Sequence, residues 1–292
     1  MQITLAKAMG TCFGVQDAIE EAMSSEFQNN LTILGQLVHN PQVVQKLKNN
    51  GVAMVSGLEE IDKIKTKFVM ITAHGAADIV KNTLKEKGFT VFDASCPLVI
   101  RVHKAIKKLV DEGYFPVVIG QGSHVEVKGI VGDLKEFYAV ENESDIAGLT
   151  QMQKSKIGIV SQTTNQMEKT EHLVQKIKDA NLQAEVVFKN TICKPTRDRQ
   201  IAAQEITEVV DILIVVGGKN SSNTKKLQMV GVGKGIDSYH VESAKEILPD
   251  WFVNKTHCGI TAGTSTPPDV IQEVFEKIKE ISDLLSNESV SV

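Results

Sequence analysis

Short runs of β-branched and other apolar residues alternate with stretches of helical periodicity along this 292-residue chain. Such alternation is typical of βαβ units, in which crossover helices join parallel strands. The pattern predicts strands in three sets and a final amphipathic helix over residues 269–285. The sets are 31–35, 52–55, 68–72 and 90–93; then 115–120, 137–140, 156–160 and 185–188; then 211–217, 237–241 and 257–261.

The third set has one strand fewer than the others, and an apolar run at residues 2–6 is left over. We therefore expect this N-terminal strand to complete the third sheet. The fold class that follows is α/β, with three small pseudo-equivalent domains whose parallel sheets surround a central site. The expected domains are 14–96, 97–193 and 194–285, with residues 1–13 completing the sheet of the last.

One cysteine occupies the same place in each repeat, after a strand and at the start of a helix: Cys12, Cys96 and Cys193. A lone cysteine there is usually a small buried hydrophobe, but core packing gives no reason for one per repeat. Ligands of open parallel sheets bind at the carboxyl ends of the strands, and helix N-termini favour the thiolate form. We therefore interpret the three cysteines as ligands of one metal centre. Cys258, inside a predicted strand, is interpreted as a core residue.

The number and spacing of these thiolates bear on which metal they bind. Structural zinc usually takes four ligands, with close pairs of the CxxC kind, whereas these three cysteines lie 84 and 97 residues apart. Three soft thiolates fit an iron–sulfur cluster with one iron left open for substrate. Catalytic zinc with thiolate ligands is the competing interpretation.

Three of the seven histidines follow predicted strands: His39, His74 and His124. His39 comes 27 residues after Cys12, and His124 comes 28 residues after Cys96, so these turns belong to the repeat. The other four histidines fit helix faces or strands. Because the chain has only three arginines, we expect a phosphate ligand to be bound by imidazolium, hydroxyl, amide and backbone N–H groups.

In the third repeat, the equivalent turn is a run of small polar residues, VGGKNSSNTKKL. It contains Ser221, Ser222 and Asn223, and a second polar turn after the next strand contains Ser265. Glycines permit a tight turn, while serine and asparagine cap a helix and present donors to an anion. Helix capping alone explains one such residue easily, but not the four consecutive polar residues from Asn220 to Asn223. The run therefore predicts an anion-binding turn.

Glu126 follows His124 by two residues in the stretch HVEV, which suggests a short extended segment with both side chains on one side. A carboxyl group close to an open metal site is placed to deliver a proton. Thr163, in the turn SQTTNQ of the same repeat, supplies a hydroxyl that can relay it. A solvated loop glutamate is the alternative interpretation.

Composition narrows the classes of function. A net charge of −4 without a basic stripe argues against nucleic acid as the main partner. No apolar run is long enough to span a membrane, and the N-terminal residues do not resemble a secretion signal. We therefore expect a cytoplasmic protein, in which disulfides rarely persist.

Nine motifs, in consistent order from residue 1 to about 285, together resemble one known family. They are CFGV, LVHN, AHG, DASCPLV, HVEV, SQTT, NTIC, GGKNSSN and TAGTS. The family is that of the 4-hydroxy-3-methylbut-2-enyl diphosphate reductases, the terminal enzymes of the non-mevalonate isoprenoid pathway. The chain departs from the usual motifs at Thr11, Ser95 and Val125, and every candidate reactive group is kept.

The resemblance implies a [4Fe-4S] cluster held by Cys12, Cys96 and Cys193, which air can degrade to a [3Fe-4S] form. It implies that Glu126, Thr163 and His124 act in catalysis. The implied diphosphate ligands are His39, His74, His124, Thr163, Ser221, Ser222, Asn223 and Ser265. The implied reaction is reductive dehydroxylation of 4-hydroxy-3-methylbut-2-enyl diphosphate to isopentenyl and dimethylallyl diphosphate at an open iron, with ferredoxin or flavodoxin as the electron donor.

Two other functions fit parts of the pattern. Quinolinate synthase, a lyase, shares the logic of three domains and three cysteines, but it needs a pocket for dicarboxylic acids. A redox sensor that carries a cluster needs no proton donor such as Glu126. The Ser/Asn-rich turn and the three histidines suit a diphosphate better than either.

Overall fold

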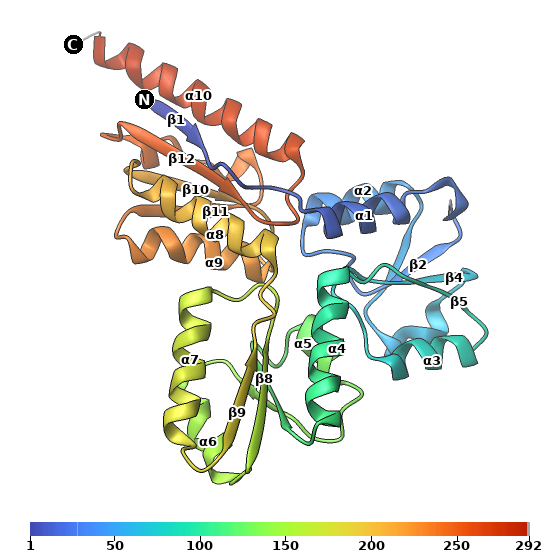
Figure 1. Cartoon of the computed structure of the whole chain (residues 1–292). Coiled ribbons are helices and arrows are strands. Elements are labelled where there is room, and N and C mark those ends of the chain that lie inside the picture. The colour runs from blue at the N-terminus through green and yellow to red at the C-terminus, as the bar shows by residue number, and fades with distance from the viewer. Residues whose placement is uncertain (28, 291–292) are drawn as a thin grey trace. The chain divides into compact units, whose positions relative to one another are not determined.

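The computed structural model describes residues 1–27 and 29–290, and Figure 1 shows its helices and strands. The chain divides into two compact units. The first consists of Met1–Gln16, His39–Gln45 and the chain from Lys194 onward; the second consists of Asp17–Val38 and Lys46–Cys193. The boundaries of three separate domains stay a prediction.

The first unit contains one four-stranded parallel sheet in the order β1-β12-β10-β11. Its elements are β1 (Gln2–Leu5), α8 (Lys194–Thr207), β10 (Ile212–Val216), α9 (Ser222–Gly233), β11 (Asp237–Val241), η4 (Ala244–Glu246), η5 (Pro249–Phe252), β12 (His257–Ala262) and α10 (Pro268–Val290). β1 pairs with β12 from Gln2 opposite His257 to Leu5 opposite Ile260. The N-terminal strand therefore lies in the sheet to which the strand count assigns it.

Both faces of this sheet are covered, with α8 and α9 on one side and α10 on the other (Figure 1). Alternate residues of β10 divide accordingly, because successive side chains of a strand point to opposite faces. Ile212, Ile214 and Val216 pack in the cluster that contains the α10 residues, whereas Leu213 and Val215 pack in the cluster that contains residues of α8 and α9. Burial on both faces explains why this strand is an unbroken apolar run.

The second unit contains two more four-stranded parallel sheets, in the orders β3-β2-β4-β5 and β7-β6-β8-β9. The first is built from β2 (Leu31–Leu34), β3 (Ala53–Val55), β4 (Phe68–Ile71) and β5 (Thr90–Asp93), with η1 (Ser25–Phe27), η2 (Leu58–Lys63) and α3 (Asp78–Glu86). The second is built from β6 (Phe115–Ile119), β7 (Tyr138–Val140), β8 (Lys156–Ser161) and β9 (Glu185–Lys189), with α4 (Pro97–Asp111), α5 (Val125–Val131), η3 (Glu143–Asp145), α6 (Ile146–Gln151) and α7 (Met167–Ala180). Helices α1 (Phe13–Ala22) and α2 (Pro41–Asn49) each begin in the first unit and end in the second.

All three sheets have the same strand order. When the strands of each set are numbered along the chain, the order is 2-1-3-4 in both sheets of the second unit, and β1 takes the fourth place in the first unit. Ligands of such sheets bind outside the carboxyl ends of the strands, near the point between strands 1 and 3 where the order reverses. None of the helices in the described part of the chain has the length and apolar character needed to cross a membrane.

Candidate functional site

The candidate residues follow three of the four strands in every sheet, always at the carboxyl end. His39, His124 and Ser221 follow the first strand of their sets; His74, Thr163 and Ser265 follow the third; Cys96, Cys193 and Cys12 follow the strand in fourth place. The second strand, at the opposite edge, contributes none of them. Each sheet therefore presents two polar side chains and one thiol at neighbouring strand ends, which extends the repeat seen among the cysteines to the whole candidate site.

Glu126 is almost fully buried in the second unit, with 2% of its surface exposed. Its Oε1 accepts a hydrogen bond from the backbone N–H of Thr163 at 2.7 Å, and its Oε2 accepts one from the Thr163 hydroxyl at 2.8 Å. Two bonds from one residue fix the orientation of the carboxylate. The pair therefore joins the two groups that the sequence assigns to proton transfer.

The stretch HVEV is not extended, because α5 begins at Val125, so the prediction of an extended segment is wrong. His124 is the N-cap of α5, and its Nδ1 accepts the backbone N–H of Glu126 at 3.1 Å. The physical reason is that an imidazole acceptor can satisfy one of the unpaired amides of a first helical turn. Because Nδ1 is an acceptor, a neutral His124 carries its proton on Nε2 and can donate from that atom.

Further contacts join the candidate residues of the second unit into one connected group. The rings of His74 and His124 lie 5.9 Å apart between centroids, edge to face. The amide of Cys96 donates to the carbonyl of Ala73 at 3.1 Å, and the amide of Cys193 donates to that of Thr163 at 3.0 Å. One continuous set of contacts thus runs from the Cys96 turn through both histidines and Glu126 to Cys193.

A second group lies in the first unit. The amide of Cys12 donates to the carbonyl of Thr264 at 3.0 Å. The next residue, Ser265, donates from its hydroxyl to the carbonyl oxygen of His39 at 3.4 Å. A Cβ on Gly218 would lie 2.3 Å from that same oxygen, so only glycine permits this approach. Cys12, His39 and the two polar turns are therefore held together.

The turn before α9 combines a helix cap with a buried amide. Ser221 is the N-cap, and its Oγ accepts from the backbone N–H of Thr224 at 3.2 Å. Asn223 is 2% exposed, and neither its side-chain nitrogen nor its oxygen has a hydrogen-bond partner among the described residues. Buried polar groups are nearly always hydrogen-bonded, so this amide is suited to a ligand.

The charge state of His39 differs from the expectation of an imidazolium. Burial, with a smaller contribution from the nearby Lys225 cation, lowers the pKa of His39 from its ordinary value of 6.5. At neutral pH, His39 is therefore mostly a neutral hydrogen-bonding group.

Asn40, the residue after His39, is a further residue that shapes this turn and is absent from the predicted site. Its Oδ1 accepts the backbone N–H groups of Gln42 and Val43 at 3.0 and 3.1 Å at the start of α2, which fixes the backbone next to His39. Asparagine before proline, in HNPQ, is a helix-start signal that could have identified it.

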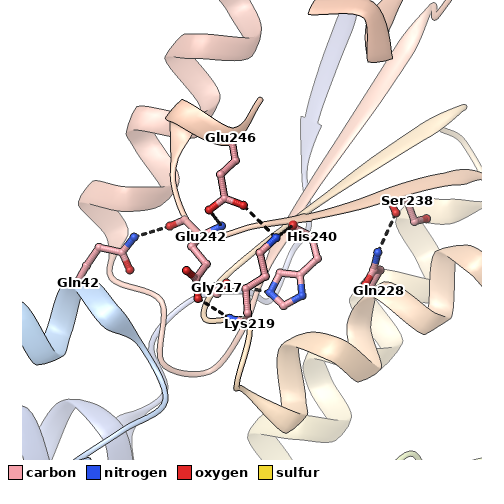
Figure 2. Close-up of polar contacts among 8 residues, drawn as sticks. All are labelled: Gln42, Gly217, Lys219, Gln228, Ser238, His240, Glu242 and Glu246. Atoms are coloured by element: carbon pink, nitrogen blue, oxygen red, sulfur yellow. Dashed lines mark hydrogen bonds and ion pairs between the residues drawn. The ribbon is translucent and has the colours of Figure 1, made fainter. Parts of the chain in front are cut away.

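Lys219 stands next to the polar turn, and its side chain belongs to a network drawn in Figure 2. Its ammonium lies 2.9 Å from Glu246 and donates to the carbonyl of His240, while its backbone amide donates to Glu242 at 2.6 Å. Nε2 of His240 lies 2.8 Å from the carbonyl oxygen of Gly217. The Lys219 ammonium is therefore paired with the Glu246 carboxylate, and hydrogen bonds hold the backbone of the turn at Gly217 and Lys219.

The donor chemistry of the cysteines fits an iron–sulfur cluster. Cys12, Cys96 and Cys193 are partly exposed, whereas Cys258 is fully buried and burial raises its pKa to about 12. No disulfide joins them, and their turns open helices, Cys96 being the N-cap of α4. Within the described residues, no three potential metal-ligating side chains form a preassembled group. Cys12 belongs to the first unit and the other two to the second, so the ligand set stays a prediction, while the buried position of Cys258 is confirmed.

Comparison with known proteins gives consistent matches over nearly the whole chain. Residues 3–279 match the model of the family described as LytB protein. A protein of Campylobacter fetus subsp. fetus, named 4-hydroxy-3-methylbut-2-enyl diphosphate reductase, is 38% identical over 288 residues, or 97% of this chain and 99% of that protein. A protein of Aquifex aeolicus with the same name is 38% identical, over 97% of this chain and 98% of that protein.

Solved structures agree with the fold. The E-1-hydroxy-2-methyl-but-2-enyl-4-diphosphate reductase of Plasmodium falciparum has a TM-score of 0.87 at 28% identity and covers 94% of this chain and 87% of its own. A second structure, of an (E)-4-hydroxy-3-methyl-but-2-enyl diphosphate reductase, has a TM-score of 0.67 at 37% identity over 96% and 99%. With a family model that spans residues 3–279 and relatives this similar along almost its full length, the chain belongs to the LytB family.

Proposed function

We propose that this chain is an oxidoreductase that converts 4-hydroxy-3-methylbut-2-enyl diphosphate into isopentenyl and dimethylallyl diphosphate. The reaction breaks the allylic C–O bond, takes up two electrons and two protons, and releases water. Membership of the LytB family and the names of the relatives support this assignment. The substrate requires an anion site for its diphosphate and a proton donor for its leaving oxygen, and candidates for both are present.

The observation that carries the proposal is the buried pair of Glu126 and Thr163. The carbonyl of Thr163 also accepts the amide of Cys193, so the proton-transfer pair is bonded directly to the turn of a proposed cluster ligand. When Glu126 is protonated, it can donate to the Thr163 oxygen, and the Thr163 hydroxyl proton is then available to the leaving oxygen. His124 supports the pair by capping the helix that carries Glu126.

The diphosphate site that we propose uses neutral donors rather than arginines. Asn223 offers a buried amide, and Ser221 and Ser222 open α9, whose N-terminus favours an anion. We assign His39, His74, His124, Thr163 and Ser265 to the same ligand on the pattern of strand ends. Because several weak donors share the charge of the diphosphate, loss of one should raise the dissociation constant without abolishing binding.

We assign Cys12, Cys96 and Cys193 as the ligands of a [4Fe-4S] cluster, which exposure to air would convert to a [3Fe-4S] form. When bound, such a cluster supplies electrons and, at an iron without a protein ligand, a Lewis acid for the substrate oxygen. The role of the chain itself is to hold three thiolates, orient the diphosphate and deliver the proton. A ferredoxin or flavodoxin is the proposed electron donor, and the cytoplasm, which keeps thiols reduced, is the proposed location.

The proposal is tested by anaerobic oxidation of a reduced viologen dye after addition of 4-hydroxy-3-methylbut-2-enyl diphosphate, with iron and sulfide counted in the same sample. We expect oxidation that depends on substrate, together with formation of both products. A sample with a full complement of iron and sulfide that leaves the dye reduced would reject the reductase and favour the lyase or the redox sensor. Zinc in place of iron would overturn the proposed cofactor.

A further inference from the structure

Arg199 is a buried cation with no part in the proposed proton transfer or diphosphate binding. It lies on α8, the helix that follows Cys193 in the chain, and is 8% exposed. Among the described residues, Arg199 and Glu126 are the buried members of the Asp, Glu, Lys and Arg class. A buried guanidinium needs partners that hold it in place, and those of Arg199 include the turn that precedes Cys12.

The guanidinium of Arg199 donates hydrogen bonds to the carbonyl groups of the two residues that precede Cys12. Its Nε and Nη2 donate to the carbonyl oxygen of Gly10 at 3.0 and 2.7 Å, and Nη2 also reaches the carbonyl oxygen of Thr11 at 3.3 Å. Nη1 donates to the carbonyl of Pro195, on its own helix, at 3.0 Å. The planar fork of arginine suits this several-point contact, which a lysine ammonium cannot reproduce.

The same turn is also bonded to the loop after β12. The amide of Cys12 donates to the carbonyl of Thr264 at 3.0 Å, and the hydroxyl of Thr11 donates to that of Thr266 at 2.9 Å. Gly10 has φ +73°, and a Cβ there would lie 2.9 Å from Cδ1 of Ile271. Both that loop and Arg199 therefore form hydrogen bonds with the backbone next to Cys12, and its placement depends on both.

We infer that Arg199 is a positioning residue for the cluster: it fixes the Cys12 turn for ligation and places a positive charge beside a cluster ligand. A cluster with thiolate ligands is anionic, and a guanidinium close to one of its ligands stabilises that negative charge. A neighbouring positive charge favours the more negative, reduced state of the cluster, so Arg199 raises its reduction potential. The inference rests on the proposed function, because it requires the cluster.

The test compares R199M and R199K with R197M and R197K, all purified and assayed as holoprotein under anaerobic conditions. Arg197 is a matched control because it lies on the same helix but is only half-buried. Iron and sulfide per chain, the rate of iron loss to a chelator, the midpoint potential, and kcat and KM with viologen are measured. Loss of a residue that orients a metal ligand weakens metal binding by about 10- to 100-fold, and iron release from R199M should accelerate on that scale.

We expect R199M to have a lower midpoint potential than the parent, R199K to keep the parent potential but release iron faster, and both Arg197 variants to match the parent. An R199M protein with the parent potential and parent iron release would overturn the inference, as would equal shifts in R197M. If R199M does not fold, R199K decides, and iron release at the parent rate would reject the positioning role. An iron-free parent would instead reject the proposed function itself, so the two failures are distinguishable.

Discussion

Glu126 and Thr163 form a pair in which both carboxylate oxygens accept hydrogen bonds from one residue, at 2.7 Å from its backbone N–H and 2.8 Å from its hydroxyl. The backbone bond holds the carboxylate in place, while the hydroxyl bond can reverse its direction when Glu126 gains a proton. The backbone bond therefore orients the carboxylate, and the hydroxyl bond provides the route for the proton. This division lets the two functions be separated by substitution.

Replacing Glu126 with glutamine should abolish transfer while preserving orientation, because the amide oxygen can still accept the Thr163 N–H. Since general acid catalysis contributes about 10²- to 10⁴-fold, we expect kcat of E126Q in the viologen assay to fall by that order. Iron content and substrate affinity should stay near the parent values. T163V, which removes only the hydroxyl, should lower kcat in the same direction. Undiminished turnover by E126Q would remove Glu126 from the mechanism.

The ligand assignment predicts opposite outcomes for two cysteines. C193S should lose iron, whereas C258S should retain it, because Cys258 is fully buried with a pKa raised to about 12. A hydroxyl in that apolar cluster costs about 1–3 kcal/mol, so C258S should unfold at lower denaturant concentration. Iron per folded chain is the measurement, with circular dichroism as the control for folding. Equal iron loss in both variants would contradict the assignment.

Asn223 should matter for substrate more than for folding, because its buried amide has no hydrogen-bond partner among the described residues. A hydrogen bond to a charged group contributes about 1.5–3 kcal/mol, and 1.4 kcal/mol is tenfold in affinity. We therefore expect N223A to raise the dissociation constant for the substrate about tenfold or more, measured by calorimetry, with little change in the free energy of unfolding.

Asn181 is the matched control for N223A. It is also buried, but its amide donates to the carbonyl of Ile177 at 2.8 Å, at the end of α7. N181A should lose about 1 kcal/mol of stability and bind substrate like the parent. If both variants bound substrate with parent affinity, Asn223 would not belong to the diphosphate site.

Lys219 should act on substrate binding through charge balance rather than by direct contact. Its ammonium is paired with Glu246 and its amide with Glu242 (Figure 2). K219M removes the cation beside Glu246 but keeps the backbone N–H that donates to Glu242. The anion-binding turn then has two carboxylates and no ammonium beside it, so we expect KM to rise by less than about tenfold with kcat unchanged. Partly exposed ion pairs contribute only about 0–1 kcal/mol, so stability should change little.

The double variant K219M/E246Q tests this explanation. It removes one positive and one negative charge, which restores the charge balance without restoring the lysine. We expect its KM to return toward the parent value. If KM of the double variant stayed as high as that of K219M, contact or backbone effects would replace charge as the cause.

Local pattern is enough to predict most of the fold and the buried position of Cys258. The strands alternate with helices as the apolar runs indicate, and the strand count assigned residues 2–6 to the sheet where β1 pairs with β12. Cys258 was correctly separated from the other cysteines because it lies within a strand instead of a strand-end turn. These features depend on neighbours in sequence, so periodicity and turn position reveal them.

Features that depend on distant contacts could not be predicted in this way. Arg199 meets Gly10 across 189 residues of sequence, and no local pattern encodes that contact. The protonation state of His39 follows from burial, which the sequence does not state. In HVEV, four residues of alternation are too few to outweigh the cap at His124, so the pattern indicates an extended segment where a helix begins.

Acidification should destabilise the fold through partly buried histidines. Burial is the largest cause of a lowered pKa at His39, His103 and His240, each from an ordinary value of 6.5. Below that value the unfolded chain binds more protons than the folded one, so this stability is fully present above pH 6.5 and is lost as pH falls. We expect the free energy of unfolding, from urea titration between pH 7.5 and about 5.5, to be level above pH 6.5 and to decline below it, and to decline less in H103Q. That range lies above the titration of carboxyl groups, so a flat or opposite trend would contradict the prediction.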